Sequence, residues 1–177
     1  MFYPNLNFPK TAGRPFFYTN FVSTVDGKVS GYWPLGSSND HKVLMELRSY
    51  ADVLVHGKNL YKQFGEITKK SLSRLPNLIY YPITEHISPK KLADDFYKKG
   101  YRNVLVEGGP TLLGSFLKEH LLDEIFLTIA PKIFGSKTGA TLTLVEGILF
   151  PPNKIKNLQL LSVKQVKNEL FLRYRVL

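Results

Sequence analysis

The chain has 177 residues, no cysteine and a net charge of +10. Its 44% hydrophobic and 21% charged residues are typical of a globular protein and argue against a disordered or fibrous chain. Without cysteine it cannot form disulfides or thiolate metal sites. No stretch is long and apolar enough to span a bilayer, and the N-terminus lacks a signal-peptide pattern. We therefore expect one cytoplasmic domain over residues 1–177.

The positive charge predicts an anionic partner, which could be nucleic acid, a membrane surface or a phosphorylated small molecule. Aromatic residues, 13% of the chain, could stack on bases. The densest basic spots, however, are the pairs Lys69-Lys70, Lys90-Lys91 and Lys98-Lys99, each beside a predicted helix or loop. Such pairs are more typical of a solvated surface. We expect neither a nucleic-acid nor a membrane partner, and we keep a nucleic-acid-binding domain as the alternative from another class.

Hydrophobic periodicity and turn residues predict an alternation of strands and helices. The predicted strands are residues 15–31 (running into a turn at Asp26-Gly27), 52–57, 77–82, 102–109 and 123–131. The predicted helices are residues 37–51 (capped by Ser38 or Asn39), 58–65 (one or two turns closed by Gly65), 88–100 and 110–120. Residues 158–177 contain two β-rich runs around Lys167-Asn168, which predicts an antiparallel hairpin.

Strands that alternate with helices predict crossover connections and a parallel sheet. The C-terminal hairpin adds an antiparallel edge. We therefore expect an α/β fold with a mixed, mainly parallel central sheet and helices on both faces. Ligands of such sheets bind at the carboxyl ends of the strands.

Glycines follow two of the predicted strands at those ends. Gly108-Gly109-Pro110-Thr111 places two glycines, and a proline suited to the first helical position, at a strand-to-helix junction. Free amides and the helix dipole would attract an anion there, and glycine would let a pyrophosphate approach the backbone. Gly57-Lys58-Asn59 repeats the pattern with a cation beside the glycine. A tight turn without ligand and a solvated lysine are the plain alternatives.

Three charged residues stand at related positions. Asp26 precedes a glycine and could be only a turn residue. Arg48 lies near the C-terminal end of a predicted helix, where its positive charge could simply stabilise the negative end of the helix dipole. Glu107 ends a buried strand, so its carboxylate needs a partner, which a ligand hydroxyl or amine could provide.

Other chemistries lack their motifs in this sequence. The four histidines, His41, His56, His86 and His120, show no metal-ligand spacing, so we expect no metal. Residues 135–139 (GSKTG) lack the spacer and order of a phosphate-binding loop and are interpreted as an ordinary loop. Neither a nucleophile elbow nor a Gly-x-Gly-x-x-Gly fingerprint is present.

Four segments together resemble one family: FVSTVDGKVSG (21–31), MELRSYADVLVHGKN (45–59), NVLVEGGPTLLGSFL (103–117) and DEIFLTIAPKIFG (123–135). They resemble the reductase domain of bacterial riboflavin biosynthesis, which has the three-layer dihydrofolate-reductase fold. The resemblance implies an NADPH-dependent reductase, commonly a homodimer. The family reaction reduces 5-amino-6-(5-phosphoribosylamino)uracil to its ribitylamino form, with hydride passing from the nicotinamide to C1 of the ribose.

The resemblance also implies roles for individual residues. Asp26 would lie near the reacting end and Glu107 would contact substrate, and both are our candidates for the catalytic site. Arg48 and Ser38 would bind substrate, with Arg48 on the phosphate side. The residues implied to bind NADPH are Val22 near the nicotinamide, then Gly57, Lys58, Asn59, Leu60, Gly108, Gly109, Pro110, Thr111, Leu112, Leu113, Gly114 and Ser115.

The sequence departs from the family pattern after Asn59. The riboflavin enzymes usually have a threonine at the position of Leu60 and then Asp-Asp-Pro or Asp-Asn-Pro, whereas this chain reads LYKQFGEITKK. That difference leaves a related pyrimidine- or pterin-type reductase as the nearest alternative. Lys58 matches the place of the dihydrofolate-reductase arginine that meets the cofactor 2′-phosphate. The zinc motif of the family's deaminase domain is absent, so we expect no deamination.

Overall fold

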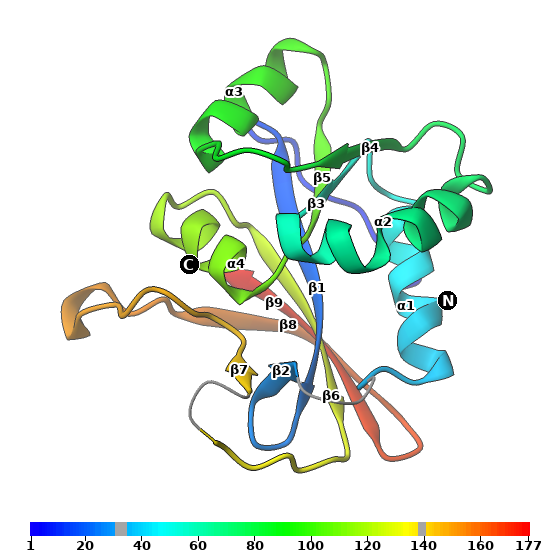
Figure 1. Ribbon diagram of the computed structural model, residues 1–177, viewed down its shortest axis with the longest axis vertical. Helices are drawn as coiled ribbons and strands as arrows, with labels where there is room; N and C mark the ends of the chain where they lie inside the picture. The colour runs from blue at the N-terminus through cyan, green and yellow to red at the C-terminus, as the bar shows by residue number, and fades with distance from the viewer. Residues whose placement is uncertain (31–34, 138–140) are drawn as a thin grey trace.

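The computed structural model describes residues 1–30, 35–137 and 141–177 (Figure 1). The strands are β1 (Phe16–Thr24), β2 (Lys28–Ser30), β3 (Val53–His56), β4 (Ile79–Pro82), β5 (Asn103–Glu107), β6 (Glu124–Ala130), β7 (Leu142–Thr143), β8 (Leu158–Val166) and β9 (Glu169–Val176). The helices are α1 (Ser38–Arg48), α2 (Lys58–Leu72), α3 (Pro89–Lys98), α4 (Pro110–Lys118) and the short 3-10 helix η1 (Pro152–Lys154).

Seven strands form one mixed sheet in the order β4-β3-β5-β1-β6-β9-β8. The first five pair in parallel, while β9 runs antiparallel to β6 and β8 antiparallel to β9. The hairpin between β8 and β9 turns at Lys167, whose φ of 54° lies in the left-handed region. The predicted parallel centre and antiparallel edge are both confirmed.

Helices cover the two faces of the sheet, as predicted (Figure 1). Side chains alternate along each strand, so neighbours on β1 enter different cores. Phe17 packs with residues of α3 and α4, while Tyr18 packs with residues of α1 and α2. The Tyr18 hydroxyl donates to the Leu47 carbonyl at 2.8 Å and ties α1 to the centre of the sheet.

Two helical boundaries differ from the prediction. Helix α2 does not end at Gly65 but spans fifteen residues, from Lys58 to Leu72. Glycine costs a helix interior only about 1 kcal/mol relative to alanine, and Gly65 is buried against the ring of Tyr61, so packing outweighs its propensity. Helix α1 is capped by Ser37, whose hydroxyl accepts from the amides of Asn39 and Asp40.

The segment predicted as one strand over residues 15–31 is divided by its turn. Strand β1 ends at Thr24, Gly27 has a φ of 78°, and β2 leaves the main sheet to pair with β7. Gly31 lies outside the described residues, as do residues 138 and 139 of the predicted 135–139 loop. No helix in the described ranges is long and apolar enough to cross a bilayer.

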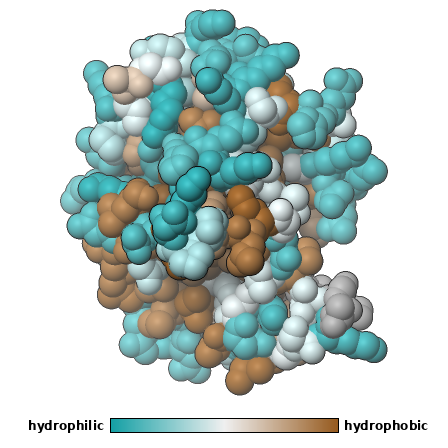
Figure 2. All heavy atoms as spheres, turned by 90° about the vertical axis from the view of Figure 1, so that its left-hand side faces the viewer, coloured by the Kyte–Doolittle hydropathy of each residue, from teal (hydrophilic) through white to brown (hydrophobic). Residues whose placement is uncertain are grey.

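The outer strands leave an apolar area on the α4 side of the sheet. The register places Leu158, Leu160 and Val163 of β8 on the same face as Tyr174 of β9, which packs against the α3/α4 core. These three side chains are 42–57% exposed. Figure 2 shows this side of the molecule, with apolar side chains gathered over its lower half.

Candidate active site

Strands β3 and β5 are parallel neighbours, so their carboxyl ends meet. His56 and Glu107 are register partners, and the Gly57 amide donates to the Glu107 carbonyl at 3.1 Å. A Cβ on Gly57 would lie 3.2 Å from Cα of Gly108. The absence of side chains on these glycines therefore allows the two turns to touch, and helices α2 and α4 begin side by side.

The two helix N-termini are open. The cap residues Gly57 and Gly109 make no side-chain cap hydrogen bond, and Pro110 occupies the first turn of α4. A Cβ on Gly109 would meet no atom within 4 Å. Two adjacent positive dipole ends with space beside the backbone suit a phosphate group. The residues present therefore fit the pyrophosphate of a dinucleotide.

The residues of α4 that were predicted to bind the cofactor lie on two different sides of the helix. Leu113 is 1% exposed and belongs to the α3/α4 core, so it faces away from solvent. Thr111, Gly114 and Ser115 instead border a cavity of about 170 Å³ against residues 146–148. A Cβ on Gly114 would lie 3.0 Å from the Glu146 carbonyl oxygen, so glycine is needed for this segment to approach the helix.

A larger cavity of about 340 Å³ lies between α1, α2 and the carboxyl ends of β1, β3 and β5. Its walls bring together four predicted site residues, Val22, Arg48, Leu60 and Glu107. The remaining lining residues are Asn20, Asp40, His41, Leu44, His56, Phe64, Ile67, Thr68 and Ser71. The volume is in the range of small-molecule sites.

A buried polar chain forms one end of this cavity. Arg48 donates from Nε to Glu107 Oε1 at 2.7 Å and from Nη2 to Oε2 at 2.6 Å. His56 Nε2 lies 3.2 Å from Glu107 Oε2, and His56 Nδ1 lies 2.8 Å from the Tyr80 hydroxyl. Arg48 Nη1 also donates to the Ser71 hydroxyl at 3.1 Å. The buried carboxylate of Glu107, which was expected to need a partner, is therefore paired with Arg48 and His56 of the protein itself.

The charge state of Glu107 follows from this chain. Burial alone raises the pKa of the Glu107 carboxyl, but its hydrogen bonds and charge interactions with Arg48 and His56 outweigh burial and hold the pKa below its usual value. Glu107 is therefore an ionised carboxylate, 6% exposed, and compensated by a bidentate guanidinium. Two of the five N–H groups of Arg48 bond to Glu107 and a third bonds to Ser71, and the charge of Arg48 is neutralised by Glu107, so a substrate phosphate would need further cations.

Two buried oxygen atoms on residues of the cavity wall lack a hydrogen-bond partner within the described ranges. Among the described residues, three buried side-chain oxygens lack a hydrogen bond, and two of them are Oδ1 of Asn20 and Oδ1 of Asp40. Burial is the main cause that raises the pKa of Asp40; a hydrogen bond from Thr128 opposes it and Glu169 adds to it. An unmade buried hydrogen bond costs about 1–3 kcal/mol. Neither oxygen recovers this cost from a partner among the described residues.

The model of the RibD C-terminal domain family matches residues 63–172, more than half of the sequence. The chain belongs to this family.

Curated relatives of this RibD-family chain share only part of it. One segment of 68 residues is 35% identical to a protein of Aquifex aeolicus named 2,5-diamino-6-ribosylamino-4(3H)-pyrimidinone 5′-phosphate reductase, and spans 38% of this chain and 29% of that protein. A protein of Archaeoglobus fulgidus with the same name is 32% identical over 65 residues, which are 37% of this chain and 30% of the relative. The matches therefore span less than a third of these relatives.

Solved structures show the same fold for the RibD-family chain. Acinetobacter baumannii RibD superposes with a TM-score of 0.77 at 17% identity over 94% of this chain and 59% of that one. Saccharomyces cerevisiae riboflavin biosynthesis reductase Rib7 gives 0.68 at 16% identity over 99% and 96%. A dihydrofolate reductase of Enterococcus faecalis gives 0.60 at 13% over 91% and 96%. The dihydrofolate-reductase fold predicted for the chain is confirmed.

Four more of the predicted residues, Asp26, Ser38, Lys58 and Asn59, do not line the 340 Å³ cavity. Asp26 is exposed and accepts from the amides of Phe134 at 3.2 Å and Gly135 at 2.8 Å, so it anchors the segment after β6. Ser38 is exposed beside the true cap, Ser37. Lys58 and Asn59 are exposed at the start of α2, next to the glycine turns.

Other cavity residues were not identified from the sequence. His56 was weighed only as a metal ligand, and the described residues hold no group of three or more metal-ligating side chains. The position of His56 in the sequence could have identified it, because His56 ends one predicted strand and Glu107 ends another, and these two strands are neighbours in the sheet. Asn20 and Asp40 gave no such signal, since polar residues in a strand and in a first helical turn are ordinary.

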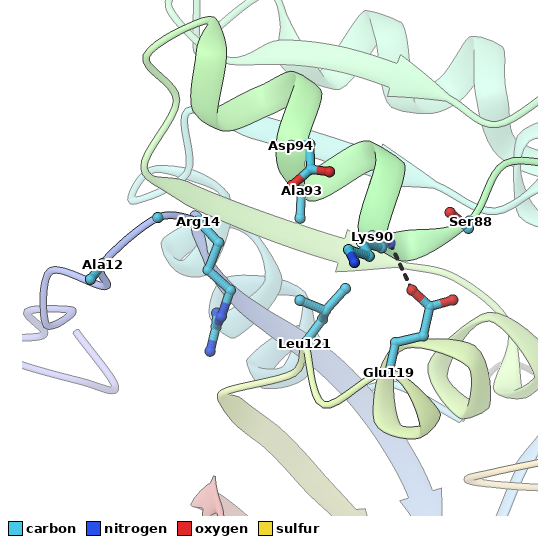
Figure 3. A pocket seen from close by; sticks show the side chains of 9 residues that line it. Ala12, Arg14, Ser88, Lys90, Ala93, Asp94, Glu119 and Leu121 are labelled. Atoms are coloured by element: carbon cyan, nitrogen blue, oxygen red, sulfur yellow. Dashed lines mark hydrogen bonds between the residues drawn. The ribbon is translucent and has the colours of Figure 1, made fainter.

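A third hollow, of about 660 Å³ and so the most voluminous of the three, lies between the segment before β1, helix α3 and the end of α4 (Figure 3). Its polar groups are largely occupied by one another. Arg14 makes two hydrogen bonds to Asp123, at 2.7 and 2.6 Å, and Glu119 accepts from the Lys90 amide at 2.8 Å. Ser88 and Glu119 thus already cap α3. The hollow is far less suited to an anion than the glycine turns.

Proposed function

We propose that the chain is an NADPH-dependent reductase of riboflavin biosynthesis. Its reaction would be reduction of 5-amino-6-(5-phosphoribosylamino)uracil to the ribitylamino form, with hydride delivered to C1 of the ribose. The proposal rests on two adjacent features. One is a cavity lined by Val22, Arg48 and Glu107, and the other is a pair of open helix N-termini that begin at glycines. Family membership and the names of the curated relatives support it.

In this proposal the two features have different tasks. The glycine turns at Gly57 and Gly109 hold the cofactor pyrophosphate, and exposed Lys58 meets the 2′-phosphate. Bound NADPH supplies the hydride. Val22, at the mouth of the cavity near the end of β1, forms the surface on which the nicotinamide rests. The ring and ribose of the substrate occupy the cavity itself.

The polar chain at the end of the cavity positions the substrate. Glu107 is held rigidly by Arg48 and His56, so a substrate hydroxyl that bonds to it is fixed without further ordering of side chains. Reduction of an imine-like carbon also needs a group that shares a proton or stabilises positive charge at the nitrogen. Asp26 remains our candidate for that role, although its present contacts are to the backbone of Phe134 and Gly135.

A turnover assay tests the proposal most directly. NADPH oxidation would be followed with the phosphoribosylaminouracil as substrate, and the product would be identified by mass. Fluorescence titrations with NADPH, NADH and a single-stranded oligonucleotide would accompany it. Binding of the oligonucleotide without binding of NADPH would contradict the enzyme and favour the nucleic-acid-binding alternative, for which only charge and aromatic content speak.

A reductase with another pyrimidine or pterin substrate is the second candidate. The observation in its favour is the α2 side of the cavity, where Leu60, Phe64 and Ile67 replace the polar stretch of the riboflavin enzymes with an apolar wall. The curated relatives are named for a 2,5-diaminopyrimidinone phosphate rather than for the uracil. The same assay with this compound and with dihydrofolate separates the candidates.

We also propose that the enzyme is a cytoplasmic homodimer. The exposed apolar face formed by Leu158, Leu160 and Val163 supports self-association, because an area of this kind is unusual on a monomer surface.

A further inference from the structure

Tyr80 has no part in the proposed mechanism, yet it ends the polar chain that leads to the cavity. It lies in the edge strand β4 and is half-buried, whereas His56 is 1% exposed. The Tyr80 hydroxyl is 2.8 Å from Nδ1 of His56, and Nε2 of His56 is 3.2 Å from Oε2 of Glu107. The rings of Tyr80 and His56 meet edge to face, with centroids 5.2 Å apart. The neighbouring strands β4, β3 and β5 therefore carry one continuous row of hydrogen-bonded side chains.

The charge of Glu107 sets the direction of the hydrogen bonds in this row. An ionised carboxylate can only accept, so Nε2 of His56 carries the proton that lies between it and Oε2. Arg48 already balances the charge of Glu107, and a second cation buried beside it would have no counter-charge. The imidazole is therefore neutral and accepts at Nδ1, which makes the Tyr80 hydroxyl the donor. Burial is the main cause that raises the pKa of Tyr80, so this hydroxyl keeps its proton.

The same row decides which oxygen of Glu107 is left for a ligand. A carboxylate has about four lone-pair positions, roughly two on each oxygen. Oε2 accepts from Nη2 of Arg48 and from His56, so both of its positions are filled. Oε1 accepts from Nε of Arg48, and from no second donor among the described residues. Glu107 lines the 340 Å³ cavity and 6% of its side chain is accessible, so the acceptor that remains for a ligand is one position on Oε1.

We propose that Tyr80 and His56 are positioning residues of the active site, which occupy Oε2 of Glu107 and so fix Oε1 as the oxygen that accepts from the substrate. The substrate group that bonds there is a hydroxyl or an N–H, since a carboxylate repels a carbonyl or phosphate oxygen. The inference rests on the proposed function, because it takes the substrate to occupy the cavity that Glu107 lines.

Loss of the Tyr80 hydroxyl would undo this arrangement from the outside. Nδ1 of His56 would lose its donor, and the imidazole could turn or move its proton to the other nitrogen. Oε2 of Glu107 would then regain a lone-pair position, and both oxygens would compete for the substrate. The substrate would have to order the carboxylate as it binds, which lowers its affinity.

Tyr80→Phe tests this step, because it keeps the ring and removes only the hydroxyl. We expect the KM for the phosphoribosylaminouracil to rise roughly three- to tenfold, the equivalent of one neutral hydrogen bond. The kcat should fall less than the KM rises, and the dissociation constant of NADPH should not change. Tyr81→Phe is the matched control, since Tyr81 is the next residue of β4 and packs in the α3/α4 core. An unchanged KM in folded Tyr80→Phe would overturn the proposal.

Variants of His56 separate its hydrogen bond from its shape. His56→Gln can still present an N–H group to Oε2 of Glu107, whereas His56→Leu cannot. We expect the KM of His56→Gln to stay within about threefold of wild type and that of His56→Leu to rise by about tenfold or more. Equal KM values in the two variants would refute the assignment to the hydrogen bond. If His56→Leu does not fold, Tyr80→Phe and His56→Gln decide the question.

Nitrogen-15 NMR of the His56 ring provides a readout besides turnover. At neutral pH the free protein should show a protonated Nε2 and an unprotonated Nδ1, and the Nδ1 resonance should shift in Tyr80→Phe but not in Tyr81→Phe. A proton on Nδ1 rather than Nε2 in the wild type would overturn the proposal.

Failure of the proposed function would look different. If the wild-type protein reduces neither phosphoribosyl compound, the reductase proposal fails and takes the substrate role of Oε1 with it. If turnover is normal and Tyr80→Phe leaves the KM unchanged, the reductase stands and the positioning inference alone fails.

Discussion

Gly109 is the residue on which the cofactor prediction can be tested most cleanly. The proposed phosphate lies beside its Cα, and a Cβ there would meet no protein atom within 4 Å. Gly109→Val should therefore fold normally and lose NADPH affinity severely, because the branched side chain would occupy the phosphate position. Melting temperature and a NADPH titration measure the two effects. A variant that binds NADPH normally would show that the pyrophosphate lies elsewhere.

Gly108→Ala is the matched control for this experiment. Its Cβ would lie 2.9 Å from Cβ of Leu112 and closer still to that side chain's Cδ2, so the helix start must shift. We expect this smaller substitution to lower the melting temperature where the larger one at Gly109 does not. The contrast separates a glycine required by packing from a glycine required by the ligand.

Lys58 is exposed at the first position of α2, beside Gly57. If it meets the 2′-phosphate, Lys58→Ala removes a charge-assisted contact worth roughly 1.5–3 kcal/mol from NADPH and nothing from NADH. The ratio of the two dissociation constants should change by about tenfold or more. Lys70→Ala, at the far end of the same helix, should leave the ratio unchanged. An equal loss for both cofactors would make Lys58 a surface lysine.

Substitution of Asp26 tests whether this residue has a structural or a catalytic role. Its carboxylate accepts a hydrogen bond from Thr24 and from the amides of Phe134 and Gly135, and these bonds lower its pKa. If these contacts are its whole function, Asp26→Asn should lower the melting temperature and keep single-turnover activity per folded molecule. If Asp26 shares a proton with the substrate, kcat should fall while NADPH binding survives. Melting curves and single-turnover rates on one preparation distinguish the two results.

At the scale of the elements, the pair Arg48–Glu107 joins α1 to β5. Glu107→Gln leaves a buried guanidinium without its counter-charge, which costs about 3–5 kcal/mol in comparable pairs. We expect a large loss in the free energy of unfolding, measured by urea denaturation, and a KM that rises more than kcat falls. Glu85→Gln, on the exposed loop before α3, is the control and should have little effect on stability. A stable variant would indicate that Arg48 finds another partner.

The same pair predicts a pH dependence of stability. Because the folded-state pKa of Glu107 lies below its usual value of 4.5, its contribution is fully present above that pH. It is lost progressively as the pH falls through the lowered folded-state pKa. The difference in stability between wild type and Glu107→Gln should therefore be constant near neutral pH and shrink on acidification. A difference that grows in acid would contradict the ionised, paired carboxylate.

At the scale of the whole molecule, the exposed face of β8 predicts the assembly state. Stable interfaces bury roughly 1,200–2,000 Å² in total, and Leu158, Leu160 and Val163 extend an apolar area beyond the cover of α4. Light scattering should give twice the chain mass of 20.2 kDa, and Leu160→Lys with Val163→Lys should give the monomer. Ile79→Lys, on the opposite edge strand β4, should leave the dimer intact. A monomeric wild type would refute the prediction.

The sequence alone determined the order of the elements, because their signals are local. Alternating apolar residues, Ser88 before Pro89, and the glycines after β3 and β5 act within a few residues and specify strands, a helix start and two open turns. From that order the mixed sheet follows, and with it the meeting of Gly57 and Gly108 at one edge. The length of α2 could not be read in this way, since Gly65 is tolerated only through its packing.

Only the tertiary structure decided what each polar side chain contacts. Arg48 and Glu107 are 59 residues apart, and their pairing depends on how α1 lies against the sheet rather than on any local pattern. The same holds for Asn20 and Asp40, whose unpaired oxygens become visible only when β1 and α1 form two walls of one cavity. Local chemistry fixes where the chain turns and caps, whereas a buried polar group takes its role from partners that folding brings to it.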